Sequence, residues 1–138
     1  MVSVKVSERI EAPSERVWEL VRDFGGVQRY SAGIESCTVE GRGIGAVRTL
    51  GLPGGLSLKE RLEAFDDAGR RLSYAIVAGP IPVAGYLATI EVRDEGSGCR
   101  IDWSSTFEPK GITDEQARGM IEGVYRSGVA GIRKALGA

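Results

Sequence analysis

The chain has 138 residues, and its 18 lysines and arginines against 19 aspartates and glutamates give a formal net charge of −1. This length predicts one domain spanning residues 1–138. A nearly neutral chain has no strong field that would attract nucleic acid or anionic lipid, so we expect no nucleic acid partner.

Histidine, the usual general base near neutral pH and the commonest metal ligand, is absent. Catalysis by Ser-His-Asp or Cys-His groups is therefore excluded. Cys37 and Cys99 are too few for a structural zinc site, and we expect free thiols, no metal and no cofactor. The charged N-terminal residues do not resemble a signal peptide, so we expect a cytoplasmic protein.

Residues 72–90 form the longest uncharged stretch, with 19 residues, about the length that spans a bilayer. Gly79, Pro80, Pro82 and Gly85 interrupt it, and a helix would lose backbone hydrogen bonds there. The stretch therefore predicts two strands joined by a loop and no membrane span.

The predicted elements begin with an alternating strand over residues 2–9, a helix that opens at Pro13 and ends before Gly25, and a short helical turn over 27–30. Turn-rich segments then separate six short strands, which indicates an antiparallel meander and disfavours a Rossmann domain. The Gly-rich string at 41–45 precedes a strand, so it is no phosphate loop. The six strands are predicted at 34–40, 46–50, 58–65, 72–78, 85–92 and 100–107.

A long helix is predicted over residues 114–136, with Thr113 and Gln116 as a capping box. Two of its glycines, Gly128 and Gly131, lie on the apolar side, where each costs about 1 kcal/mol relative to alanine. Either they allow close contact with the sheet, or they leave volume for a ligand. The predicted apolar arc consists of Ala117, Met120, Ile121, Val124, Tyr125, Gly128, Gly131, Ile132 and Ala135.

Alternation along the strands predicts which residues face this helix. This inner face carries aromatic and polar side chains where a plain core would be aliphatic, and that mixture is typical of a small-molecule pocket. It consists of Leu58, Glu60, Leu62 and Ala64, then Leu72, Tyr74, Ile76 and Ala78, then Tyr86, Ala88, Ile90 and Val92, and finally Ile101, Trp103, Ser105 and Phe107.

Glu60 needs a partner if it is buried on that face. It either pairs with Arg48 for structural reasons, at a hydrated rim, or contacts a ligand or acts as an acid or base. Tyr74, Tyr86 and Trp103 are likewise either core aromatics or ligand contacts.

Four segments, IEAPSERVWELVRDF at 10–24, GAVRTL at 45–50, KERLEAFDD at 59–67 and FEPKG at 107–111, resemble the START/Bet v 1-like (SRPBCC) superfamily in its polyketide cyclase/dehydrase branch. The resemblance covers nearly the whole chain. It implies an α+β helix-grip fold, in which a seven-stranded antiparallel sheet curves around the long C-terminal helix and two short helices follow the first strand.

The stretch QRYSAGIESCTVE at 28–40, and Leu50 to Gly54 before Lys59 to Leu62, are similar to plant abscisic acid receptors of the PYR/PYL type. That similarity implies that Leu52 and Pro53 form a lid. Ser31 replaces the receptor lysine that meets the hormone carboxylate, and residues 79–83, Gly-Pro-Ile-Pro-Val, replace the phosphatase-facing latch. A ligand without a carboxylate therefore fits better. The implied pocket residues are Glu60, which reaches the ligand through water, Tyr86, Met120, Val124 and Gly128.

These observations favour a protein that binds a hydrophobic small molecule, such as a lipid, polyketide or isoprenoid, in a lidded cavity between the sheet and the C-terminal helix. The alternative is a polyketide cyclase/aromatase or dehydratase that uses Glu60 or a pocket tyrosine as acid or base. A third possibility is a homodimer or a protein partner that binds through the loop from Gly51 to Leu56. The predicted ligand-binding residues are Arg48, Leu52, Pro53, Glu60, Leu62, Tyr74, Ile76, Tyr86, Trp103, Ser105, Met120, Val124 and Gly128.

Overall fold

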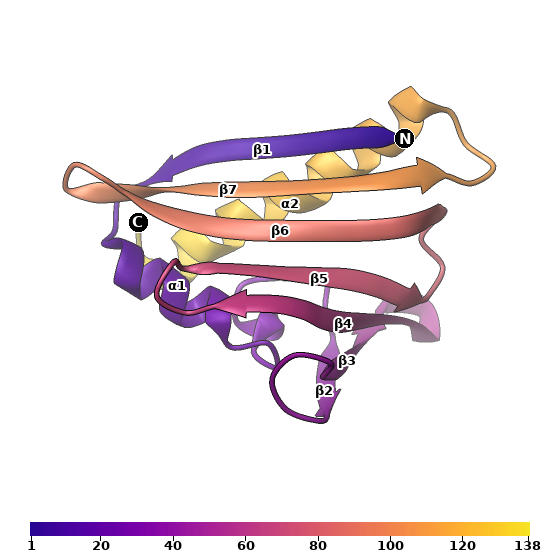
Figure 1. The fold of residues 1–138 in the computed structure, drawn as a ribbon, viewed down its shortest axis with the longest axis horizontal. Coiled ribbons are helices and arrows are strands. Elements are labelled where there is room, and N and C mark those ends of the chain that lie inside the picture. The colour runs from indigo at the N-terminus through magenta and orange to yellow at the C-terminus, as the bar shows by residue number, and fades with distance from the viewer.

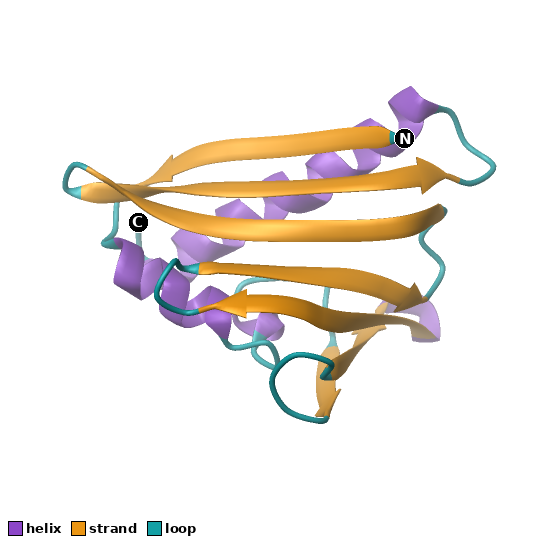
Figure 2. Ribbon diagram, viewed as in Figure 1, coloured by secondary structure: helices purple, strands orange, loops and turns teal.

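The structure, a computed structural model, describes residues 1–138 and contains one seven-stranded antiparallel sheet in the order β1-β7-β6-β5-β4-β3-β2. The long helix α2 crosses one face of the sheet (Figures 1 and 2). The helix-grip fold expected from the sequence is therefore confirmed. The elements are β1 (Val2–Ile10), α1 (Ser14–Arg22), the 3-10 helix η1 (Val27–Arg29), β2 (Ser36–Glu40), β3 (Val47–Leu52), the 3-10 turn η2 (Pro53–Gly55), β4 (Leu56–Asp66), β5 (Arg71–Ala78), β6 (Val83–Glu95), β7 (Gly98–Pro109) and α2 (Asp114–Leu136).

All the predicted strands are present, and most are longer than predicted. The ladder between β6 and β7 continues to the pair Glu95 and Gly98, beside a turn whose Gly96 has a φ of 61°. Strand β2 is shorter than predicted and starts at Ser36. The turn η2 was not predicted, and it forms the single 3-10 turn between β3 and β4.

Two register shifts in the ladder between β4 and β5 correct the predicted inner face. Ala64 and Ala78 were predicted to face inward, and both are exposed. An extra residue on one strand of a pair reverses the alternation beyond it. Beyond the second shift Phe65 turns inward, where its ring lies 5.7 Å from that of Trp18 on α1, measured between centroids.

Helix α2 begins at the predicted capping box, in which Thr113 and Gln116 exchange hydrogen bonds of 2.9 and 3.1 Å. It packs mainly against β1 and β7, at one side of the sheet. That position rotates the buried arc relative to the prediction: Val129 is buried, whereas Val124 and Ala135 are exposed. Helix α2 thus leaves the β3–β4 side of the sheet largely uncovered.

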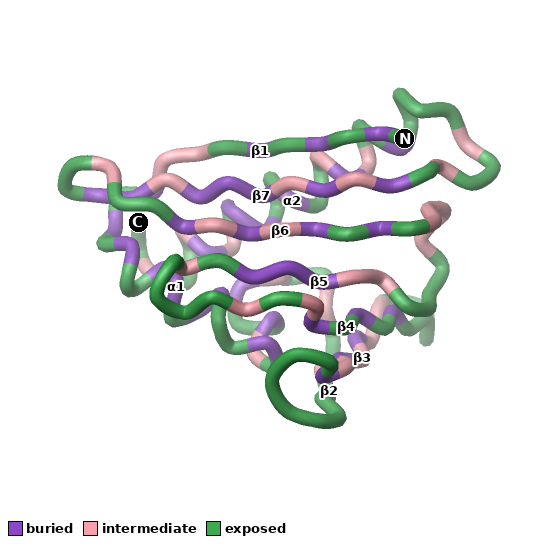
Figure 3. Tube along the Cα trace, in the orientation of Figure 1, coloured by how far each residue is buried: buried purple, intermediate pink, exposed green.

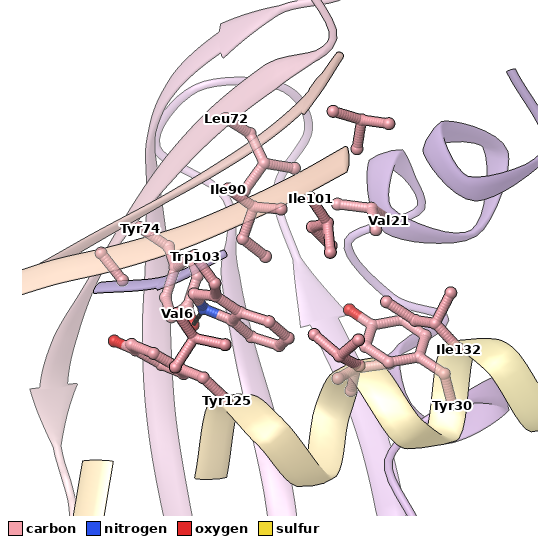
Figure 4. Close-up of a cluster of buried hydrophobic side chains, with 14 of the residues drawn as sticks. Val6, Val21, Tyr30, Leu72, Tyr74, Ile90, Ile101, Trp103, Tyr125 and Ile132 are labelled. Atoms are coloured by element: carbon pink, nitrogen blue, oxygen red, sulfur yellow. Dashed lines mark hydrogen bonds between the residues drawn. The ribbon is translucent and has the colours of Figure 1, made fainter. Parts of the chain in front are cut away.

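The core lies between the sheet and the two helices, as the buried segments in Figure 3 and the packed side chains in Figure 4 show. Helix α1 contributes Val17, Trp18, Leu20 and Val21 to this core. Both cysteines are free thiols, and no helix has the length and apolar character needed to cross a membrane.

Candidate functional site

A groove of about 460 Å³ opens between α2 and the uncovered ends of β3 and β4; we call it the α2 groove. Strand residues Leu52 and Leu58 form one wall, and Met120 and Val124 of α2 form the other. Six of the ten lining side chains are apolar, so the groove favours an apolar molecule. The lining consists of Ser31, Gly33, Ile34, Leu52, Leu58, Ile81, Met120, Gly123, Val124 and Ser127.

A short segment, residues 51–56, borders the α2 groove where β3 turns into β4. Leu52 lines the groove, and the Pro53 that follows it is exposed. Gly54 and Gly55 have φ values of 82° and 76°, in the left-handed region that glycine adopts without strain. These two glycines give the segment points about which it can bend.

The Arg48–Glu60 ion pair lies deeper, on directly opposed positions of β3 and β4. Arg48 and Glu60 are only 5% and 6% exposed, and Arg48 Nε and Nη2 lie 2.8 and 2.7 Å from Glu60 Oε1. The third nitrogen, Nη1, donates to the Phe24 carbonyl at 3.1 Å, and the guanidinium lies 4.1 Å from the Phe24 ring centroid. The predicted pairing with Arg48 is therefore present, but it is buried and not at a hydrated rim. These contacts supply the partner that a buried carboxylate needs.

Electrostatics keep this arginine charged. Burial alone would lower the pKa of Arg48, but the Glu60 carboxylate and the rings of Tyr30 and Tyr74 raise it by more, so the net shift of the pKa is upward. Arg48 is therefore a permanent cation whose charge Glu60 neutralises inside the fold.

An aromatic network fills the space beneath the middle of α2 (Figure 4). Trp103 stacks on Tyr125 with ring centroids 4.9 Å apart, and its Nε1 donates to the Tyr74 hydroxyl at 3.1 Å. The hydroxyls of Tyr86 and Tyr125 share a hydrogen bond. Ser105 Oγ is buried near Tyr125 and has no hydrogen-bond partner of good geometry. This part of the interior is packed.

Two glycines of α2, Gly128 and Gly131, were expected either to allow close contact with the sheet or to leave volume for a ligand. A Cβ on Gly128 would lie 2.5 Å from Cζ3 of Trp103, and one on Gly131 would overlap the backbone carbonyl of Tyr30. The space beside both glycines is therefore occupied, so they allow close packing and leave no volume for a ligand. Gly123 differs, since a Cβ there would meet nothing within 4 Å.

The structure brings only some of the predicted site residues to the groove. Leu52, Met120 and Val124 line the α2 groove. Pro53 is exposed beside the groove, and Ile76 is half-buried. The other eight predicted residues are buried in the interior: Arg48, Glu60, Leu62, Tyr74, Tyr86, Trp103, Ser105 and Gly128.

Sequence reasoning missed several lining residues of the α2 groove, among them Gly33, Ile34, Ile81 and Ser127. Leu58 was predicted to face inward but was not named as a site residue. Ile81 lies in the loop that matches the receptor latch, and this position was the one available signal for it. The loop residues Gly33 and Ile34 follow no periodic pattern.

All four tyrosines are buried, and burial is the main cause of a raised pKa at each, with that of Tyr125 raised to about 12. Their neutral forms therefore stabilise the fold below the unfolded-state pKa of about 10, and this contribution is lost as the pH rises from about 10 toward 12. We expect tyrosinate absorbance and loss of circular dichroism to appear together in an alkaline titration. Tyrosinate absorbance near pH 10 with the native circular dichroism intact would contradict this, and the chain in denaturant is the control.

A second hollow, of about 450 Å³, lies over β1, β6 and β7, but hydroxyl-bearing and charged side chains such as Ser3, Lys5 and Ser104 make up most of its lining. Only Val4 and Leu87 there are hydrophobic. The α2 groove is therefore the better candidate for an apolar ligand.

Comparison with known proteins agrees with this architecture. A family model described as polyketide cyclase / dehydrase and lipid transport matches residues 1–137. Abscisic acid receptor PYL2 of Arabidopsis thaliana is 32% identical over 134 residues, which cover 88% of this chain and 70% of the receptor.

Among solved structures, XoxI of Bacillus cereus superimposes with a TM-score of 0.91 at 34% identity, covering 98% of this chain and 95% of that one. Ara h 8.0201 shares the fold, with a TM-score of 0.81 at 18% identity over 99% of this chain and 98% of that one. The family match and the PYL2 similarity confirm the resemblance that the sequence motifs indicated. The chain belongs to the polyketide cyclase/dehydrase and lipid transport family.

Proposed function

We propose that the protein binds one small hydrophobic molecule in the α2 groove. The observation that carries the proposal is a groove of about 460 Å³ with six apolar lining side chains. Ligand sites commonly have volumes of about 300–1,000 Å³, apolar walls and a few polar groups. The hydroxyls of Ser31 and Ser127 are the polar side-chain groups here.

The ligand is uncharged, such as a neutral lipid, polyketide or isoprenoid. No charged side chain lines the α2 groove, and the nearby Arg48 is already neutralised by Glu60. A carboxylate placed there would lose its hydration without gaining a free cation. Ser31, at the position that corresponds to the receptor lysine, supports the same conclusion.

The segment 51–56 is proposed as the lid of this site. Closure about Gly54 and Gly55 would lay Leu52 over the ligand and change the exposure of Pro53 and Leu56, which is 53% exposed. A second copy of the chain or another protein whose binding depends on the bound ligand would bind at this segment.

The alternative function, a polyketide cyclase or dehydratase, has less support. Glu60 is held by two bonds from Arg48, and burial raises the pKa values of Tyr74, Tyr86 and Tyr125. An efficient acid or base titrates near the working pH, and a raised tyrosine pKa moves away from it.

The test is binding of the neutral fluorescent probe N-phenyl-1-naphthylamine. Gly123 lines the α2 groove and has room for a Cβ, so Gly123→Leu adds side-chain volume to the groove and is expected to weaken binding at least about tenfold. Gly119→Leu is the matched control, because Gly119 lies on the same helix in open space and does not line the groove. Equal affinity in the two variants, or no saturable binding at one probe per chain, would refute the proposal. Native mass spectrometry of the purified protein then identifies any retained molecule.

A further inference from the structure

A second groove, of about 430 Å³, lies where the end of α1 meets the turn between β2 and β3; we call it the α1 groove. Phe24, Ala46 and Leu62 form its apolar floor, with Val39 and Phe65 at the sides. Arg22, Asp23 and Arg42 are the charged residues of its lining. It therefore combines an apolar surface with fixed charges, which the α2 groove lacks.

The turn at residues 41–45, Gly-Arg-Gly-Ile-Gly, keeps this groove open. Gly41, Gly43 and Gly45 have φ values of 86°, 62° and 94°, and a Cβ on Gly43 or Gly45 would meet nothing within 4 Å. The turn therefore stands away from the sheet, as the exposed loop beside β2 in Figure 3 shows. Because its glycines carry no side chains, they do not fill the space above Ala46.

The charges around the α1 groove do not cancel. Arg22 lies 3.4 Å from Asp67, and Asp23 lies 3.5 Å from Arg29. Arg42 makes no salt bridge and no hydrogen bond. An exposed arginine beside an apolar floor complements an acidic group on an otherwise apolar molecule.

The two grooves are separate sites. Along the inner face of β3 and β4, the pair Ala46 and Leu62 comes first, then Arg48 and Glu60, and then Leu50 and Leu58. Ala46 and Leu62 line the α1 groove, whereas Leu58 lines the α2 groove. The buried ion pair thus lies between them, and Arg48 also holds the carbonyl and ring of Phe24.

We propose that the α1 groove is a second ligand site, which takes a small amphipathic anion: an apolar body with one acidic group that pairs with Arg42. The acid lies at the rim, in solvent, and the apolar body covers Phe24, Ala46 and Leu62. This site stands independently of the α2 groove and of the neutral ligand assigned to it.

The test compares two probes of nearly the same shape, 8-anilino-1-naphthalenesulfonate, which carries one acidic group, and the neutral N-phenyl-1-naphthylamine. Arg42→Gln is expected to weaken binding of the sulfonate about 1.4- to fivefold, the range for a solvent-exposed ion pair, and to leave binding of the neutral probe unchanged. Val39→Trp fills the α1 groove from the edge strand and is expected to weaken the sulfonate at least about tenfold. Thr38→Trp, one residue away on the opposite face of β2, is the control and should not change its affinity.

Gly123→Leu separates the two proposals, because it blocks only the α2 groove. If the sulfonate binds Val39→Trp as tightly as the unsubstituted chain, or loses its affinity in Gly123→Leu, the α1 site is refuted whatever the neutral probe does. If Gly123→Leu leaves the affinity of the neutral probe unchanged, while Arg42→Gln and Val39→Trp weaken binding of the sulfonate, the proposed function fails and the α1 site stands. Amide chemical-shift changes at residues 41–45 on addition of the sulfonate provide a second readout, and their absence at saturation would also refute the site.

Discussion

Arg48→Met is expected to lower the free energy of unfolding at neutral pH by about 3–5 kcal/mol, because it leaves the Glu60 carboxylate buried without a partner. Native proteins of this kind are stable by about 5–15 kcal/mol, so the loss removes a large part of the total. The measurement is equilibrium unfolding by denaturant, followed by circular dichroism.

Two further variants test whether burial of the ion pair causes this loss of stability. Arg61 and Glu63 form an ion pair at the surface. Its N···O distance of 2.7 Å equals the shortest one between Arg48 and Glu60. Arg61→Met is therefore expected to cost less than about 1 kcal/mol. The double variant Arg48→Met/Glu60→Leu removes both charges and should regain most of the lost stability. An Arg48→Met loss no larger than that of Arg61→Met, or a double variant as unstable as the single, would show that the pair is not effectively buried.

Gly131→Ala is expected to lower the free energy of unfolding by about 2 kcal/mol, the second large effect. The added Cβ would overlap the carbonyl group of Tyr30, and neither that backbone nor α2 can move without disturbing its neighbours. Overpacking of this kind costs about 1–3 kcal/mol, and we expect the upper end because the obstacle is backbone. The better helix propensity of alanine offsets about 1 kcal/mol.

Gly119→Ala is the matched control on the same helix. A Cβ at Gly119 would meet nothing within 4 Å, so the propensity gain is unopposed and the variant should be more stable by about 0.5–1 kcal/mol. Opposite signs for the two substitutions, measured by denaturant unfolding, are the expected result. Stabilisation by both would mean that α2 and the end of η1 are not in close contact in solution.

Local patterns were sufficient for most of the architecture. Period-two alternation and turn residues predicted all seven strands, and the capping box of Thr113 and Gln116 placed the start of α2 correctly. The same alternation put Glu60 on the inner face, and pairing with Arg48, on the preceding strand, was one of its predicted alternatives. These predictions succeed because neighbours in sequence determine them.

The predictions that failed depend on how elements meet. Ala64 faces outward because a bulge in β4 shifts the alternation, and the bulge arises from pairing with β5. Val129 is buried and Val124 is exposed because α2 lies over β1 and β7. A helical wheel shows which residues share a side, but it does not show the rotation that packing selects.

The elements and their order thus follow from the sequence alone, since local periodicity, capping and turn residues specify them. The family follows from the resemblance of four sequence segments. Where space remains depends on how the elements pack. This packing filled the interior with the stacked Trp103 and Tyr125, and it left one groove beside Gly123 and another beside Arg42. The physical reason is that a groove is bounded by side chains from several separate segments, and no single stretch of sequence specifies the distances between them.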